Sequence, residues 1–156
     1  MPGCPPVRAD HIGSLLRPIA LRQAHRQRAA KEIDEARFQA IQDAAMRDVV
    51  RMQEACGLLV ANDGEYRRGS YWSRFVEQME GFRVGPAVFK FRDDHGCEVD
   101  FTAPYVSGKL KRVRSIAGDE LEFIRANVTS AMPKITLPSA PTMQFYDEDR
   151  IFKRHF

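Results

Sequence analysis

The chain is poor in cysteine and has no long apolar run. Its 156 residues include three widely spaced cysteines, Cys4, Cys56 and Cys97, which excludes a disulfide framework and indicates reduced thiols. Cys56 ends an amphipathic segment and is expected to be buried. No apolar stretch approaches the roughly 18 residues of a membrane span. Residues 1–6 lack the cationic start and apolar core of a signal peptide. We therefore expect a cytoplasmic protein that does not bind membranes.

A strong excess of one charge is also missing. The chain has 24 Lys and Arg against 21 Asp and Glu, and a net charge of +3 is no argument for nucleic-acid binding. The basic run from Lys109 to Arg114 alternates like a strand and has no interleaved aromatic platform, so we expect no nucleic-acid partner. Length and an ordinary globular composition predict a single domain, residues 1–156.

Apolar periodicity predicts a long helix from about Lys31 to Cys56, with acidic residues near its start and Gly57 as its stop. Pro18 is expected to interrupt any helix across its own region. A shorter helix is predicted before Gly81, and another over Asp119–Ala131. The apolar faces of these two helices are Trp72, Phe75, Val76 and Met79, and Leu121, Ile124 and Val128.

Short apolar runs between these helices predict strands. The runs are Val7–Ser14, Leu58–Ala61, Val106–Val113 and Lys134–Pro138. The second and fourth are expected to be buried on both faces, as in a parallel sheet. Phe82–Tyr105 alternates around a turn at 93–96 and predicts a β-hairpin. A further helix could begin in residues 147–156. Strands that alternate with helices predict an α/β fold with parallel βαβ units.

Unusual residues follow each predicted strand. They form the segments 11–14, 62–65, 107–108 and 138–141. Because ligands bind beyond the carboxyl ends of strands in parallel α/β folds, we expect the functional side chains in these segments.

Three motifs stand out along the chain. They are Arg8–Pro18 (RADHIGSLLRP), Gln53–Leu58 with Asp63-Gly64-Glu65, Arg67-Arg68, Trp72 and Phe75, and Lys134–Ser139. Together, and in this order, they resemble the cobalamin-independent methionine synthase-like proteins. The resemblance implies a (β/α)8 TIM barrel. A complete barrel takes about 250 residues, so about four strands, the first half, are expected here, with the β-hairpin as an insertion.

The resemblance also implies a function. Family members transfer a methyl group from methyltetrahydrofolate to the thiol of homocysteine in methionine biosynthesis, or perform related zinc-thiolate alkyl transfers. The implied substrate-binding residues are Ile12, Gly13, Ser14 and Glu65. Backbone N–H groups and the Ser14 hydroxyl can hold a carboxylate, and Glu65 can pair with an α-ammonium group.

The family's zinc is held by ligands in the second half of the barrel, which this chain does not reach. The three cysteines do not resemble those ligand motifs, so we expect no zinc in this chain alone and assign no catalytic residue.

Several side chains leave alternatives open. His11 either bonds to the loop backbone or contacts the substrate. Asp63 and Glu65 either bind substrate or form a solvated turn. Arg67 and Arg68 either bind an anionic folate tail or begin a solvated helix.

Three hypotheses follow for the whole chain. It is part of a zinc-dependent methyltransferase, or a non-catalytic half-barrel that binds an amino acid, or a protein that completes itself by self-association or with a second-half partner chain. Unpaired sheet edges favour association, with Leu58, Val60, Ile135 and Leu137 as the candidate exposed residues.

Overall fold

The computed structural model describes residues 11–87, 90–92, 95–99, 101–139 and 142–143. The chain divides into two compact units. Unit 1 comprises Met1–Tyr71 and Ala117–Thr136, and unit 2 comprises Trp72–Ile116 and Leu137–Phe156. The single domain over 1–156 therefore stays a prediction.

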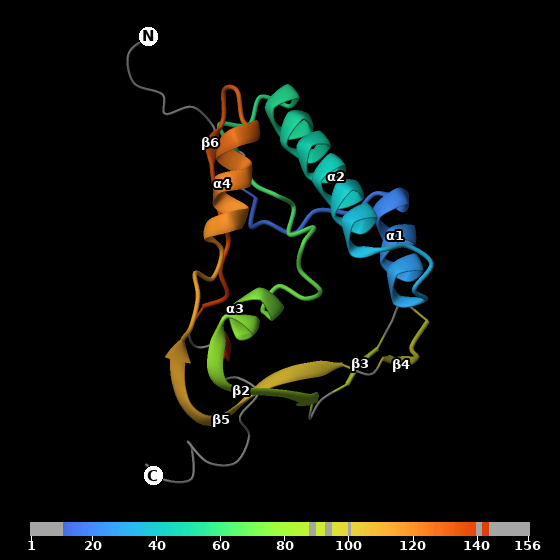
Figure 1. Cartoon of the computed structure of the whole chain (residues 1–156), viewed down its shortest axis with the longest axis vertical. Helices are drawn as coiled ribbons and strands as arrows, with labels where there is room; N and C mark the ends of the chain where they lie inside the picture. Colours follow the sequence, from blue (N-terminus) through green and yellow to red (C-terminus); the bar gives the residue numbers. More distant parts are fainter. Residues whose placement is uncertain (1–10, 88–89, 93–94, 100, 140–141, 144–156) are drawn as a thin grey trace. The chain divides into compact units, whose positions relative to one another are not determined.

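Unit 1 begins with two packed helices, α1 (Ile19–Ala29) and α2 (Glu35–Ala55), drawn in blue and teal in Figure 1. The carboxylate of Asp34 accepts a hydrogen bond from the backbone N–H of Arg37 at 2.7 Å and caps α2. Gly57 lies just beyond the helix with a φ of +76°, a conformation that glycine adopts without strain. The long helix and its stop are thus confirmed.

Helix α1 was not predicted. Pro18 directly precedes the helix, and its carbonyl accepts the first helical hydrogen bond from the N–H of Arg22 at 3.0 Å. Proline lacks an N–H group, but the start of a helix needs none there, and a φ of −56° suits the entry. A proline that was expected to interrupt a helix therefore initiates one.

The sheet of unit 1 is short and parallel. Strand β1 (Val60–Ala61) pairs with β6 (Met132–Pro133), and helix α4 (Gly118–Asn127) precedes β6. The predicted parallel pairing and the helix are confirmed. The predicted strand Lys134–Pro138 is wrong, because β6 ends at Pro133, before that run begins. The expectation of burial on both faces is wrong, because Leu59 is 59% exposed and Leu137 is 55% exposed. Of the four residues expected to be exposed, Leu137 is, whereas Leu58, Val60 and Ile135 are half-buried.

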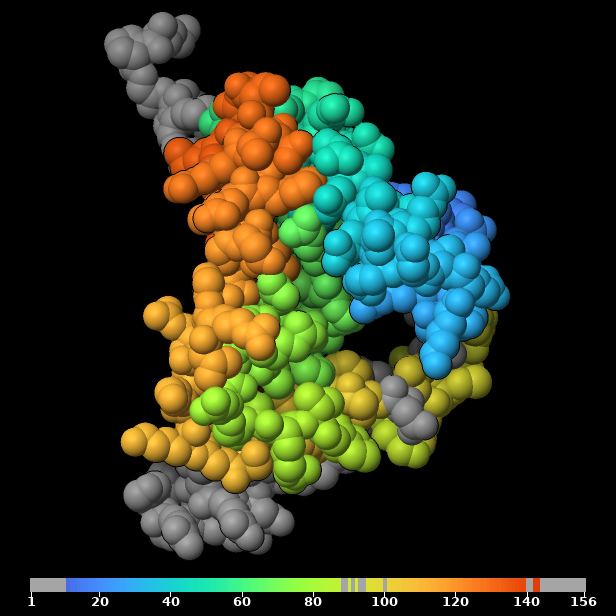
Figure 2. Space-filling view, in the orientation of Figure 1, coloured from blue at the N-terminus to red at the C-terminus, as the bar shows by residue number. Residues whose placement is uncertain are grey.

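Helix α2 carries both hydrophobic clusters of unit 1. One cluster faces α1, and the other joins α2 to α4 and the sheet. Figure 2 shows the orange atoms of α4 against the teal atoms of α2. The buried members are Leu21, Ala45, Met46, Val49 and Tyr66 in the first cluster, and Val50, Ala61, Ile124 and Ala131 in the second. Cys56 lies outside both clusters and is exposed, which corrects its expected burial.

Unit 2 is built on an antiparallel ribbon of β2 (Met79–Pro86) and β5 (Thr102–Arg112). Strands β3 (Phe91–Arg92) and β4 (Glu98–Val99) pair antiparallel on the two sides of the predicted turn at 93–96, of which residues 93 and 94 lie outside the described residues. Strand β5, however, pairs antiparallel with β2, so residues 107–108 lie inside a strand and not at a strand end. The alternation of apolar and polar residues does not show whether a strand pairs parallel or antiparallel with its neighbour.

The short helix α3 (Ser73–Glu77) precedes the ribbon. It is shorter than predicted, because Met79 already begins β2. Trp72 is buried, as its core interpretation required.

Several expectations fall outside the described residues, namely the first part of the strand over 7–14, Cys4, and the helix in 147–156. Among the helices that the structure describes, none has the length and apolar character needed to cross a membrane. The described residues form an α/β structure with open, two-stranded sheets.

Candidate functional site

The candidate site of unit 1 is centred on the loop that follows β1. Two side chains shape this loop. Oδ1 of Asn62 accepts a hydrogen bond from the N–H of Gly64 at 2.7 Å, and Oδ1 of Asp63 accepts one from the N–H of Glu65 at 3.0 Å. Glu65 adopts a φ of +60°, which is uncommon for a residue with a side chain. The local sequence therefore holds Glu65 in a conformation that an isolated chain would avoid.

Glu65 is only 6% exposed, and its carboxylate belongs to a buried polar network. Oε1 of Glu65 accepts a hydrogen bond from Oγ1 of Thr136 at 2.7 Å and from Nη1 of Arg68 at 3.4 Å. The guanidinium of Arg68 also binds Oε2 of Glu120 at 2.8 Å. One buried cation is thus shared by two buried carboxylates, so Glu65 has no cation of its own within this cluster.

Asp63 is a second buried acid beside Glu65. It is 0% exposed, and its Oδ2 has no hydrogen-bond partner among the described residues. Burial raises the pKa of the Asp63 carboxyl, while the N–H of Glu65 and the charge of Arg68 act in the opposite direction. The loop therefore places two buried acids next to each other. Glu65 has an ion-pair partner in Arg68, whereas Oδ2 of Asp63 has no hydrogen-bond partner among the described residues.

The loop of residues 11–14 approaches this network through Gly13. A Cβ at Gly13 would lie 2.6 Å from Cγ2 of Thr136 and 3.2 Å from Oε1 of Glu65. Only glycine allows the backbone this close to the carboxylate. The structure thus places Gly13 beside Glu65. Ile12 is 90% exposed and Ser14 is also exposed, so neither side chain packs into the network.

His11 is held by a glutamine. Its Nε2 lies 2.6 Å from Oε1 of Gln53. The amide of Gln53 donates to the carbonyls of Val49 and Asn62 at 2.9 and 2.8 Å, which fixes its Oε1 as the acceptor. His11 therefore carries a hydrogen on Nε2. The sequence analysis left two partners open for His11, the loop backbone and the substrate. In the structure, the partner of its ring is the side chain of Gln53.

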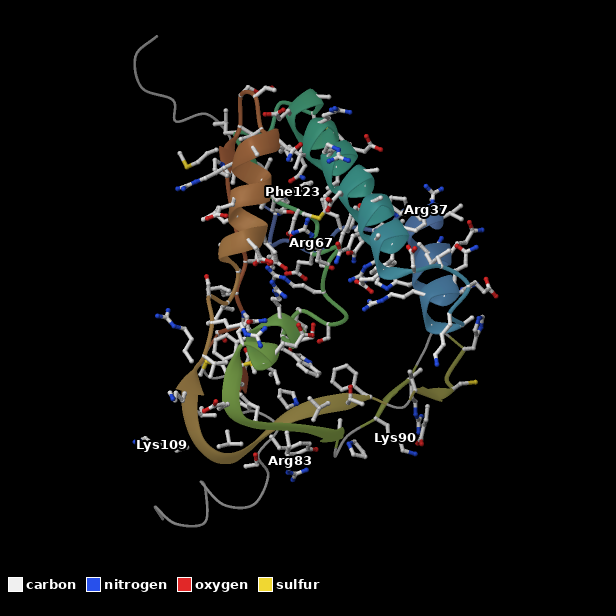
Figure 3. The ribbon with its side chains drawn as sticks, in the orientation of Figure 1. Arg37, Arg67, Arg83, Lys90, Lys109 and Phe123 are labelled. Atoms are coloured by element: carbon white, nitrogen blue, oxygen red, sulfur yellow. The ribbon has the colours of Figure 1, made fainter. Side chains whose placement is uncertain are left out.

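The two neighbouring arginines differ. Arg67 binds Oδ1 of Asp43 at 2.6 Å and stacks over Phe123 at 4.7 Å, and Figure 3 shows Arg67 and Phe123 close together. The side chain of Arg68 is 2% exposed. The interpretation of Arg68 as part of a solvated helix start is therefore wrong.

Four residues of the network had no predicted role in holding an amino acid: Gln53, Arg68, Glu120 and Thr136. Gln53 had a detectable signal, because it falls on the buried face of α2, four residues after Val49. Thr136 lies within the Lys134–Ser139 motif, but no pattern connects it to Arg68, 68 residues away. Glu120 had no signal, because it meets Arg68 across 52 residues of sequence.

The chain is similar in sequence or fold to several known proteins. No family model matches it. The protein YxjH of Bacillus subtilis, whose name states that it is uncharacterized, is 33% identical over 92% of this chain. Methionine synthase of Sulfolobus acidocaldarius is 27% identical over 91% of this chain. A B12-independent methionine synthase from Shewanella, solved in complex with selenomethionine, superposes with a TM-score of 0.64 at 22% identity over 90% of the chain.

The chain is related to the cobalamin-independent methionine synthases. It spans 37% of the length of YxjH and 40% of the Sulfolobus methionine synthase. It likewise matches 40% of the Shewanella chain, and that similarity shows the fold alone.

The resemblance to cobalamin-independent methionine synthases implies a zinc ion in the parent proteins. In the part of the chain that the structure describes, no three His, Cys, Asp or Glu side chains converge in a way that could hold a metal ion. The acids of the network do not change this result, because Arg68 already occupies the space between Glu65 and Glu120. Within the described ranges, the residues therefore do not fit the metal.

Proposed function

We propose that unit 1 binds the amino-acid end of a thiol or thioether amino acid, such as homocysteine or methionine. Glu65 would pair with the α-ammonium group, and the N–H groups of Ile12 and Gly13 with the Ser14 hydroxyl would hold the carboxylate. His11 and Asp63 would border the ligand.

The observation that carries this proposal is a buried carboxylate with an incomplete set of cations. Arg68 is shared between Glu65 and Glu120. A second cation, Arg17, bonds to the backbone carbonyls of Glu65 and Arg68 and not to the carboxylates. A ligand ammonium would supply the missing charge, and a charge-assisted hydrogen bond is stronger than a neutral one.

Calorimetry with L-methionine and L-homocysteine tests the proposal. We expect Glu65→Ala to weaken binding by about 1.5–3 kcal/mol, because it removes a charged hydrogen-bond partner. Asp63→Ala is the matched control, since it removes an adjacent buried acid, and we expect a smaller loss. Equal or reversed losses would contradict the role of Glu65.

We further propose that the complete protein transfers a methyl group from methyltetrahydrofolate to the homocysteine thiol within a (β/α)8 barrel. The chain supplies the first strands of that barrel, and zinc comes with the remainder. The parallel pair β1–β6 supports this proposal, because parallel sheets rarely stand with exposed faces and Leu59 and Met132 are 59% and 69% exposed. The exposed free thiol of Cys56 favours a cytoplasmic location.

The partner of this sheet would be a second-half segment, or a second copy of the chain. Light scattering at tens of micromolar tests the assembly, and elemental analysis with and without a second-half chain tests the zinc. We expect a dimer or larger species and no stoichiometric zinc in the chain alone. A folded monomer would contradict the assembly, and about one tightly held zinc per chain would contradict the metal assignment.

A further inference from the structure

Arg68 makes more contacts to the network than any sequence pattern indicated. Its guanidinium reaches Oε2 of Glu120 at 2.8 Å, Oγ1 of Thr136 at 3.2 Å and Oε1 of Glu65 at 3.4 Å. Its side chain is 2% exposed, and that of Glu120 is 0% exposed. The three partners come from the loop after β1, from α4 and from the chain just after β6. A single side chain therefore links the segments that surround Glu65.

The contacts are uneven in a way that orients Glu65. The described hydrogen bonds to its carboxylate, from Thr136 and Arg68, both end on Oε1. Neither of these bonds reaches Oε2 of Glu65. Within the described residues, this atom is also not one of the buried atoms that lack a partner, so solvent reaches it. Since the side chain is 8% exposed, one carboxylate oxygen is anchored and the other lies at the open edge of the network.

Stability alone does not account for this arrangement. Burying an ion pair costs desolvation free energy that its attraction often fails to recover, so buried pairs seldom stabilise a fold relative to apolar residues. Glu65 also has the unfavourable φ of +60°. Arg68 helps to hold this strained residue, because its own N–H bonds to the carbonyl of Glu65 at 3.1 Å.

We propose that Arg68 is the positioning residue of the amino-acid site. Anchored by Glu120, it fixes Oε1 of Glu65 together with Thr136, so that Oε2 meets the ammonium group of the ligand. Arg68 itself does not touch the ligand. The inference rests on the proposed function, and it makes selectivity for α-amino acids over acids without the amino group depend on Arg68.

The test measures that selectivity in the full chain. Calorimetry compares L-methionine with methylthiobutanoate, which is methionine without its amino group. We expect Arg68→Met to lower the preference for L-methionine at least tenfold, because Glu65 loses its orientation. Arg67→Met is the matched control: it removes the adjacent arginine, which pairs with Asp43 and Phe123 and does not contact Glu65. We expect it to change the preference less than threefold.

Conservative variants keep the result interpretable. Arg68→Lys should restore part of the preference, since lysine keeps the charge and loses the planar fork. If Arg68→Met does not fold, Thr136→Val removes the other anchor of Oε1 with Arg68 intact, and it should also lower the preference.

The outcomes separate the two proposals. Equal loss of affinity for both ligands would indicate a merely structural role and overturn the inference. An unchanged preference in both Arg68→Met and Thr136→Val, or an equal loss in Arg67→Met, would overturn it as well. If the unmodified chain binds neither ligand at millimolar concentration, the proposed function fails and the inference fails with it.

Discussion

Unit 1 and unit 2 differ in which groups form their hydrogen bonds, side chains in unit 1 and the backbone in unit 2. The sheet of unit 1 has two strands of two residues each, and much of its interior bonding comes from side chains such as Gln53, Glu65 and Arg68. Unit 2 has a longer backbone ladder, which runs from the pair Met79–Arg112 to the pair Pro86–Thr102 and is interrupted by a shift of register between Glu80 and Phe82. The last six residues of β5 are exposed. Side-chain identity therefore decides the structure of unit 1, whereas backbone pairing carries most of unit 2.

Core truncation tests this contrast most strongly. Met46 of unit 1 is 0% exposed, so we expect Met46→Ala to lower the free energy of unfolding by about 2–5 kcal/mol through the cavity it leaves. Leu110 of β5 is 43% exposed, and we expect Leu110→Ala to cost far less. Met52→Ala is a control on the same helix, with 46% exposure. Urea denaturation measures all three, and equal losses for Met46 and Leu110 would break the comparison.

A pair of glycines gives the next effect in size. Gly13→Ala would place a methyl group 2.6 Å from Cγ2 of Thr136, and overpacking of this kind costs about 1–3 kcal/mol. A Cβ at Gly108 in β5 meets nothing within 4 Å, so we expect Gly108→Ala to be neutral or slightly stabilising. Thermal unfolding compares the two.

A second substitution tests whether the methyl group of Thr136 causes the loss of stability in Gly13→Ala. Thr136→Ser removes the clashing methyl group and keeps the hydroxyl that bonds Glu65, so we expect it to recover part of the stability lost in Gly13→Ala. Failure of this rescue would show that the methyl group of Thr136 does not carry the clash, and would leave its Oγ1, 2.9 Å from the same Cβ, as the next candidate.

The pH dependence of stability should show the smallest effects, with opposite signs at two acids of unit 1. Backbone N–H groups of Ser130, Ala131 and Thr129 lower the pKa of Glu54 to about 2. The unfolded chain therefore takes up a proton first on acidification, and the stabilisation by Glu54 is lost between about pH 4.5 and pH 2. Glu54→Gln should have a lower melting temperature at neutral pH and approach the parent chain near pH 2.

Asp63 should behave in the reverse sense. Burial raises its pKa above the ordinary value of 3.8, so ionisation favours the unfolded chain as the pH rises through that value. We expect Asp63→Asn to melt at a higher temperature than the parent chain at neutral pH and at the same temperature below about pH 3.8. A lower melting temperature at neutral pH would show that the charged form of Asp63 stabilises the loop.

The parts that the sequence predicted are those with local causes. Helix α2 has strong apolar periodicity, an aspartate cap and a glycine stop, so its bounds were predictable within a few residues. Helix α1 was missed because only Leu21 and Ala24 of its eleven residues are buried, which leaves almost no apolar stripe. The partner of β5 could not be predicted, because alternation does not specify strand direction.

The candidate site divides in the same way. The motifs around Gly13 and Glu65 pointed to the loops that the structure brings together. The residues that hold Glu65 in place were not predictable, because Glu120 lies 52 residues from Arg68 in the sequence.

The left-handed backbone of Glu65 has a consequence for what selection would retain there. A residue with a side chain at this φ costs roughly 1–2 kcal/mol relative to glycine. A library at position 65 selected only for folding should therefore enrich glycine and asparagine. A library selected for retention on an immobilised amino acid should enrich glutamate instead. The two selections would separate the information that the fold requires at this position from the information that the ligand requires.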